Sequence, residues 1–398
     1  MDATAKSARA NRGPTPRAAF AGVFSTTFLG LLAVGAVLPV LPHYVKGPLG
    51  STDLAVGVVV GCYAITGLVC RPFAGRLADT RGRRRAVLLG CCLSAAAGLI
   101  YLVPAGLAGL ILARLVLGAG EGTLFTAGSA WIVDLAPPDR RGRVIGLYGL
   151  AVWSGLSVGP LLGTVVLGAA GYETVWILAA ALPALGAAVA LRVPDPFVPR
   201  PAVARQRLIA TESVRPGFAL AMGSVGYATV ASFVVLHLDQ RGVGHGALVF
   251  GAFAAMVVIT RLIGGDLPDV VGPARCATAA ALVEAAGLSA LAVAHGLPVA
   301  LLGALAMGAA FSLLYPSLSL VVVGRVPEAR RGAALGTFTA FFDAGVGLGA
   351  PLAGAASALT GYEGAFLLAT ASALGAGALV ALTISGRGRA LVGQLGTR

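Results

Sequence analysis

The chain is a succession of long apolar stretches, each bounded by a few polar or charged residues. A helix needs about 20 apolar residues to cross the hydrocarbon core of a bilayer, and twelve stretches of this kind follow one another. The stretches are continuous and do not alternate apolar with polar positions, which sets aside a membrane-spanning β-barrel. The predicted helices cover residues 19–41, 55–77, 86–104, 107–131, 143–168, 173–191, 214–236, 247–264, 276–294, 298–323, 332–357 and 363–384.

The composition agrees with a protein dissolved in lipid. Of 398 residues, 57% are hydrophobic and only 11% are charged, so a water-soluble fold could not bury the apolar surface. The 57 glycines fit helices that approach one another closely in a membrane. The five cysteines lie within or at the ends of predicted helices, where they act as small apolar residues and indicate neither a disulfide nor a metal site.

The net charge of +13 could suggest a nucleic-acid partner, so the positions of the basic residues decide its meaning. If the N-terminus is cytoplasmic, 24 of the 29 Lys and Arg residues lie on that side, and only Lys46 and Arg241 lie on the other. This asymmetry is the positive-inside pattern of membrane proteins, and it accounts for the basic character without nucleic acid. We therefore expect a multi-pass protein of a bacterial cytoplasmic (inner) membrane, with both termini cytoplasmic.

An internal repeat fixes the expected architecture. At an offset of 190 residues, Arg71, Gly75 and Asp79 align with Arg261, Gly265 and Asp269, and further identities follow through the sixth helix of each unit. Six helices per unit is an even number, so the units are parallel repeats. The expected fold is an all-α membrane protein with twelve transmembrane helices in two six-helix halves. We expect a tail at 1–18, an N-terminal half at 19–191, a cytoplasmic linker at 192–216, a C-terminal half at 217–384 and a tail at 385–398.

The turn after the second helix carries a motif of glycines, an aspartate and arginines over residues 75–85. Glycines allow a tight turn, and the aspartate accepts hydrogen bonds from helix ends and arginines. The motif resembles the loop signature of the major facilitator superfamily. The resemblance implies a gate that closes the cytoplasmic side, and a plain basic turn is the alternative. The expected gating residues are Gly75, Asp79, Gly82, Arg83 and, in the second half, Asp269.

Two further helices carry motifs. In the fourth helix, Arg114 and the glycines after it resemble the signature of proton-coupled members, with Glu121 at a position where a small residue is more usual. Arg114 and Glu121 are seven residues apart, so they share a helix face about 10 Å apart along the axis. The fifth helix resembles the antiporter signature of twelve-helix drug/proton antiporters, except at Thr164. Its motif residues are Gly146, Gly155, Gly159, Pro160 and Gly163.

Acidic residues inside the predicted membrane spans are candidates for proton binding, because a charge in the bilayer costs several kcal/mol. Glu121 and Asp343 both break the repeat, since they align with Phe311 and Trp153. We expect Glu121, Asp343 and Arg114 to take part in proton coupling. The alternative is a structural ion pair with Arg114, Arg71 or Arg261. Glu284 lies in the ninth helix, which is usually peripheral in the superfamily, and Asp266 lies in the second loop motif; neither joins the coupling set.

Aromatic residues near the axis between the halves are candidates for a substrate cavity, with ordinary core packing as the alternative. They are Trp153, Tyr227, Phe311, Tyr315, Phe341 and Phe342. The chain has no phosphate-binding loop, zinc-protease motif or usable Ser/His/Asp arrangement, so we expect no enzyme activity, no cofactor and no metal. The energy for transport is then expected to come from an ion gradient.

These patterns together predict a monomeric, proton-coupled antiporter in the lipid bilayer that exports a small amphipathic drug or metabolite by alternating access. An importer or uniporter for a sugar or other small metabolite on the same fold is the alternative. Such a cavity needs polar side chains, yet the single Asn and the three Gln lie outside the central region. A sensor that binds a ligand without transporting it is a third possibility.

Overall fold

The computed structural model describes residues 16–136, 141–195, 210–327 and 330–395, and these contain helices and turns but no strand. Most of the predicted N-terminal tail, much of the linker and residues 396–398 of the C-terminal tail lie outside these ranges. The helices are α2 (Pro16–Val37), α3 (Val40–Lys46), α4 (Asp53–Arg81), α5 (Arg83–Tyr101), α6 (Gly106–Leu135), α7 (Arg141–Ala190), α8 (Val214–Gln240), α9 (Gly246–Ile263), α10 (Leu267–Val271), α11 (Pro273–Ala292), α12 (Leu297–Val323) and α13 (Arg331–Leu395).

Two of these helices each contain two membrane spans. α7 has 50 residues and α13 has 65, whereas about 20 residues cross the bilayer core. Each helix is broken by one glycine with a positive φ, Gly171 in α7 and Gly361 in α13, and the chain reverses there. Ten described segments are long and apolar enough to cross a membrane, and dividing α7 and α13 at these glycines gives the twelve expected spans.

The internal repeat is visible in the backbone. Gly171 and Gly361 are 190 residues apart, and both have a φ of 77°. Gly82, between α4 and α5, has a φ of 106°, and its counterpart Gly272, between α10 and α11, has a φ of 96°. A side chain is strained at such angles, which explains glycine at all four turns.

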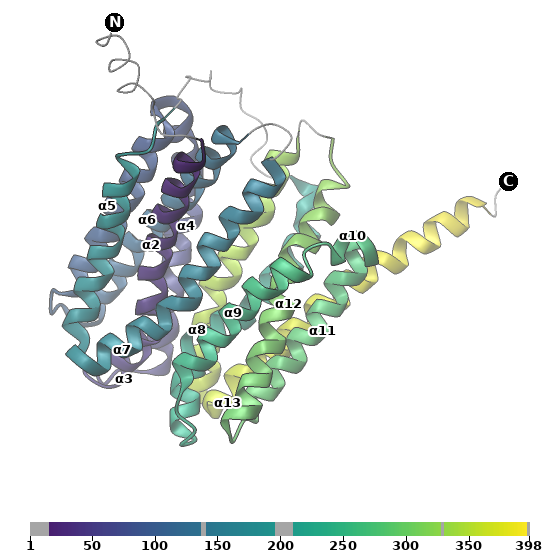
Figure 1. Cartoon of the computed structure of the whole chain (residues 1–398). Coiled ribbons are helices and arrows are strands. Elements are labelled where there is room, and N and C mark those ends of the chain that lie inside the picture. The colour runs from purple at the N-terminus through teal and green to yellow at the C-terminus, as the bar shows by residue number, and fades with distance from the viewer. Residues whose placement is uncertain (1–15, 137–140, 196–209, 328–329, 396–398) are drawn as a thin grey trace, which may run out of the picture.

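The helices form two groups that lie side by side (Figure 1). The N-terminal half contains α2 to α7, drawn in purple to teal, and the C-terminal half contains α8 to α13, drawn in green to yellow. We call the end of the bundle where α4 meets α5 the linker face, because the connection between the halves starts and ends there. The opposite end, where α3 and α8 end, is the far face.

Glycines let the first span of α7 pack directly on α2. A Cβ atom on Gly155 would lie 2.8 Å from the backbone nitrogen of Leu32, and one on Gly159 would lie 2.6 Å from the Cα atom of Gly35. Gly163 approaches the backbone of Ala36 in the same way. These three motif glycines of the fifth span therefore allow the backbones of two helices to touch. The fourth motif glycine, Gly146, lies earlier in α7, nearer the linker face.

The two halves meet along α4 and α13 and along α7 and α9. A Cβ atom on Gly61 of α4 would lie 3.0 Å from the Cβ atom of Ala350 in α13. At the far face, Asp53 accepts hydrogen bonds from Ser357 at 3.0 Å and from Tyr362 at 3.4 Å. His43 of α3 lies 3.3 Å from a carboxylate oxygen of Asp239 in α8. These contacts join the halves at the far face.

Candidate functional site

An ion pair connects the halves inside the bundle. Arg71 lies in α4 and Asp343 lies in α13, on the helices that line the interface between the halves. The guanidinium donates from Nε to Oδ2 at 2.8 Å and from Nη2 to Oδ1 at 3.1 Å. The side chains are 19% and 7% exposed, so water screens the pair only weakly. The contacts of Ser157 with Gly251, of Asp53 with Ser357 and Tyr362, and of His43 with Asp239 also join the halves, nearer the far face.

Glu121 lies beside this pair without joining it. It occupies the middle of α6 and is half-buried. Among the described residues its carboxylate has no hydrogen-bond or salt-bridge partner. The charges that act on it are those of Arg71, Asp343 and Arg114. The charges of two acids, one from each half, therefore act on Arg71, which is bound to the acid of the opposite half.

Arg114 is held by backbone atoms and not by an acid. It is completely buried, and it donates from Nε to the carbonyl of Val59 at 2.9 Å and from Nη2 to the carbonyl of Val60 at 2.7 Å. Its guanidinium also lies 4.4 Å from the centre of the Tyr63 ring. These contacts fasten α6 to α4, the helix that carries Arg71.

Four of the six aromatic candidates form one cluster. The Trp153 ring lies edge-on to Phe311 at 5.4 Å and to Tyr227 at 6.2 Å, across the interface between the halves. Tyr227 stacks on Phe311 at 5.5 Å, and Phe342 lies 6.2 Å from Phe311. Edge-to-face and stacked pairs at these distances are favourable, so the rings form one apolar wall between the halves.

The other two aromatic candidates lie apart from this wall. Tyr315 shares a hydrogen bond of 2.8 Å with Thr339, and the charges of Arg71, Asp343 and Arg261 act on it. It therefore belongs to the polar part of the site. Phe341 packs on Phe218 at 5.0 Å, within the C-terminal half.

The loop motif forms a charged network within the N-terminal half. Arg83 is 6% exposed and binds Asp79 in the preceding turn and Asp134 at the end of α6, the latter at 3.0 Å. In the C-terminal half, Asp269 is exposed on the short helix α10, and Pro273 stands where the repeat would place an arginine. The network therefore exists in one half only, and in this structure Asp79 is paired within its own half. Gly75 lies in α4 with open space around it, and Gly82 forms the turn.

The sequence interpretation overlooked the far-face contacts made by Asp53, Asp239 and His43. A signal was available, because each of these polar residues lies where a predicted helix ends at the same face of the bundle. Their pairing depends on which helices of the two halves are neighbours, and the repeat alone does not give that.

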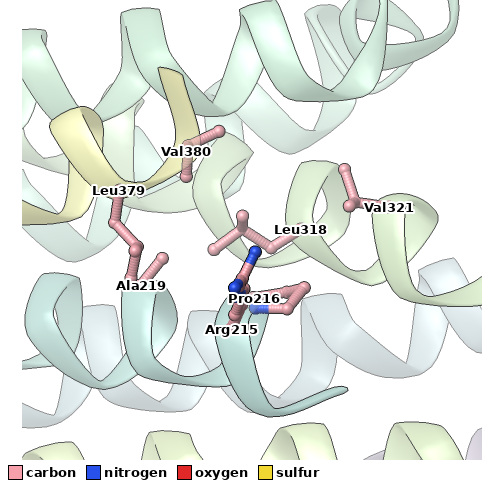
Figure 2. A pocket seen from close by; sticks show the side chains of 7 residues that line it. All are labelled: Arg215, Pro216, Ala219, Leu318, Val321, Leu379 and Val380. Carbon is pink, nitrogen blue, oxygen red and sulfur yellow. The ribbon is translucent and has the colours of Figure 1, made fainter. Parts of the chain in front are cut away.

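A small pocket lies elsewhere, within the C-terminal half near the linker face (Figure 2). Its lining is apolar apart from Arg215 and consists of Arg215, Pro216, Ala219, Leu318, Val321, Leu379 and Val380. It does not reach the interface between the halves. Among the described residues, no group of His, Cys, Asp and Glu side chains is arranged to hold a metal ion.

Comparisons with known proteins agree with this architecture. The family model described as Major Facilitator Superfamily matches residues 23–283 and 217–397. An uncharacterized MFS-type transporter of Salmonella typhimurium is 36% identical over 371 residues, which cover 91% of this chain and 95% of that protein. An uncharacterized MFS-type transporter of Burkholderia mallei is 34% identical over 378 residues, which cover 90% of this chain and 92% of that protein.

Solved structures share the fold at low sequence identity. A nucleoside transporter, NupG, superposes with a TM-score of 0.79 at 14% identity, covering 91% of this chain and 99% of that one. The human organic anion transporter MFSD10 superposes with a TM-score of 0.71 at 20% identity, covering 92% of this chain and all of that one. At these identities the likeness establishes the fold alone.

Proposed function

The chain belongs to the Major Facilitator Superfamily, and on that premise we propose that this transporter is a proton-coupled antiporter that exports a small amphipathic molecule. The observation that carries the proposal is that Arg71 binds Asp343 of the opposite half while also feeling the charge of Glu121 of its own half, which has no hydrogen-bond partner among the described residues. An arginine on which two acids act has two alternative partners. The protonation state of one acid then decides which partner it takes.

The proton is proposed to act through Glu121. When Glu121 is protonated and neutral, Asp343 is the only charged partner of Arg71, and the ion pair links the halves as in this structure. When Glu121 loses its proton, its negative charge competes with Asp343 for the guanidinium. A weaker Arg71–Asp343 ion pair lowers the free energy needed to separate the two halves at the far face. Proton release on the linker side is thereby coupled to the change of state.

The orientation of the transporter follows from its charges. The linker face receives most of the arginines, so we propose that it is cytoplasmic and that the far face is exposed to the outside. The contacts of Asp53 and His43 join the halves at the far face, and we propose that this structure corresponds to a cytoplasm-facing state. We further propose a monomer in the bacterial cytoplasmic membrane, with Asp79 and Arg83 closing the cytoplasmic side in the opposite state.

The proposed cargo is apolar or amphipathic because of the aromatic wall. Trp153, Tyr227 and Phe311 present ring faces and edges to the interface between the halves. Few amide side chains are available in the chain to bind the hydroxyl groups of a sugar. An aromatic or hydrophobic molecule is therefore the better match. Arg114 is proposed to keep α4 and α6 in register so that Arg71 stays within reach of Glu121.

The test is transport by the purified protein in proteoliposomes that carry an imposed pH gradient. A panel of lipophilic dyes and drugs serves as cargo, and the proton flux is followed with a pH-sensitive dye trapped in the vesicles. Antiport predicts that cargo and protons move in opposite directions, and that Glu121→Gln and Asp343→Asn abolish the coupling. If both variants keep gradient-driven transport, the mechanism is wrong.

Import or uniport on the same fold is the second candidate, because the structural relatives include a nucleoside transporter and peptide transporters. The same vesicles separate the candidates. Cargo and protons moving in the same direction would indicate symport, and cargo moving without protons would indicate uniport. A nucleoside and a dipeptide are therefore included in the panel.

A further inference from the structure

Glu284 is a buried acid that the proposed coupling mechanism does not use. It lies in α11, its side chain is completely buried, and neither carboxylate oxygen has a hydrogen-bond partner among the described residues. Buried polar groups are almost always hydrogen-bonded, and an ionised carboxylate without partners is far more costly than a neutral one. A residue this unfavourable calls for a specific explanation.

Glu284 faces glycines of α8, and no hydrogen-bond partner for it is present among the described residues. A Cβ atom on Gly226 of α8 would lie 2.5 Å from one carboxylate oxygen, and one on Gly223 would lie 3.4 Å from the other. The carboxyl group therefore packs against a bare glycine face of α8. The other side chains around these glycines are Leu288 of α11 and Met307 and Leu314 of α12. Among the described residues of α8, α12 and α13, no titratable or charged group is found to act on Glu284.

We propose that Glu284 is a second proton-binding site, occupied and closed off from water while α8 rests against α11. The proton comes from water when α8 withdraws and returns to water by the same route. The ligand is a proton and not a metal ion, because an oxygen in contact with the glycine face leaves no room for an ion, and the described residues supply no second donor group. This inference rests on the proposal that the halves rock and that protons drive the movement.

The position of α8 explains how such a site connects to transport. Tyr227, next to Gly226 in the chain, belongs to the aromatic wall, and Asp239 at the end of α8 contacts His43 at the far face. The proposal adds that α8 shifts against α11 within the C-terminal half when the far face opens, and this shift lifts the glycine face from Glu284. Protonation of Glu284 favours the position in which the glycine face of α8 contacts Glu284. By thermodynamic linkage, that contact favours protonation of Glu284.

The proton itself is tested by infrared spectroscopy of the purified protein at neutral pH. A protonated carboxyl group gives a carbonyl band that a carboxylate lacks, so Glu284→Gln should remove one component of this band. The component of protonated Glu121 should remain and should be removed by Glu121→Gln. Glu363→Gln is the matched control, because Glu363 is an exposed acid paired with Arg241, and it should leave the band in place. If Glu284→Gln is not recovered as folded protein, Glu284→Asp should shift the band.

The connection to α8 is tested by the distance between spin labels on Ala105→Cys and His295→Cys, in a background where the exposed Cys92 is replaced by serine. These positions are exposed, lie on far-face turns of opposite halves and are equivalent in the repeat. In the wild type, raising the pH should increase the fraction of molecules in which the two labels are far apart, because loss of the proton from Glu284 favours the state with an open far face. With Glu284→Gln, the labels should stay at the short distance across the same pH range.

The outcomes separate this proposal from the proposed antiport. The infrared band does not depend on any cargo, so a band unaffected by either Glu284 variant contradicts the proton site even if antiport is demonstrated. Equal pH responses of the label distance in the wild type and Glu284→Gln contradict the connection to α8. The vesicles could show no antiport while the infrared band and the pH response both depend on Glu284. In that case the proton site is established and the transport proposal is wrong.

Discussion

Arg71 and Asp343 are 272 residues apart in the chain and are joined by two hydrogen bonds, of 2.8 and 3.1 Å, across the interface between the halves. The repeat does not duplicate this pair. Arg261 occupies the position equivalent to Arg71, but the position equivalent to Asp343 is Trp153. Arg261 donates to the backbone carbonyl of Ser312 at 3.2 Å. One arginine of the repeat links the halves, and the other stays within its own half.

The first prediction concerns the stability of this link. Asp343→Asn should destabilise the protein by about 3 kcal/mol, because removing one partner leaves a largely buried guanidinium without its ion pair. The double variant Arg71→Gln/Asp343→Asn should be less destabilised than Asp343→Asn, since it leaves no unpaired charge. Thermal unfolding in detergent measures both.

The control for this measurement is the exposed pair Glu212 and Arg330, whose side chains are 28% and 46% exposed. Solvent-exposed ion pairs contribute little to stability, so Glu212→Gln should lower the unfolding temperature only slightly. An equal effect of Glu212→Gln and Asp343→Asn would show that the central pair does not hold the halves together.

The second prediction separates function from stability at Glu121. Because Glu121 has no hydrogen-bond partner among the described residues, Glu121→Gln should change the free energy of unfolding by less than about 0.5 kcal/mol. The same variant should lose the pH dependence of transport, since the amide binds no proton. Unfolding curves and vesicle flux at several pH values give the two results. A large loss of stability would mean that Glu121 is paired in the folded protein.

The number of spans and the turn glycines were predictable from the sequence because they depend on local hydrophobicity and on the repeat. The predicted spans 143–168 and 173–191 correspond to the two parts of α7, which the structure joins at Gly171. The family-level prediction of a major facilitator transporter is confirmed by the family model and the curated relatives. Helix ends differ by a few residues, as at α5, which begins at Arg83 and not at residue 86.

The pairing of side chains between helices was not predictable from one sequence. Asp343 had three arginines as possible partners, and hydrophobicity does not tell which way each helix face is turned. Arg114 was grouped with Glu121 because seven residues place both on one face of α6, yet it binds the carbonyls of Val59 and Val60. The choice depends on how closely α4 approaches α6, which is a property of the packed bundle.

The third prediction concerns the glycines of α7. Gly159→Ala should destabilise the protein by about 1–3 kcal/mol, because the new methyl group would lie 2.6 Å from the Cα atom of Gly35 and 2.7 Å from the nitrogen of Ala36. Gly149→Ala in the same helix is the control, since no atom lies within 4 Å of its Cβ position. That variant should be neutral or slightly stabilising, because alanine favours the helix. Equal losses at both positions would contradict a packing role for Gly159.

The last prediction concerns the closure of the far face. Asp53 is mostly buried and accepts hydrogen bonds from Ser357 and Tyr362 of the opposite half, while Lys46 binds it within its own half. Hydrogen bonds to a charged group contribute about 1.5–3 kcal/mol, so Asp53→Ala should increase the far-face-open population by roughly tenfold or more. Spin labels at Ala105→Cys and His295→Cys measure this population. Glu363→Gln removes a salt bridge at the same face but within one half, so it should leave the distances unchanged. If both variants shift the distances equally, the effect belongs to the loops of the far face and not to the contact between the halves.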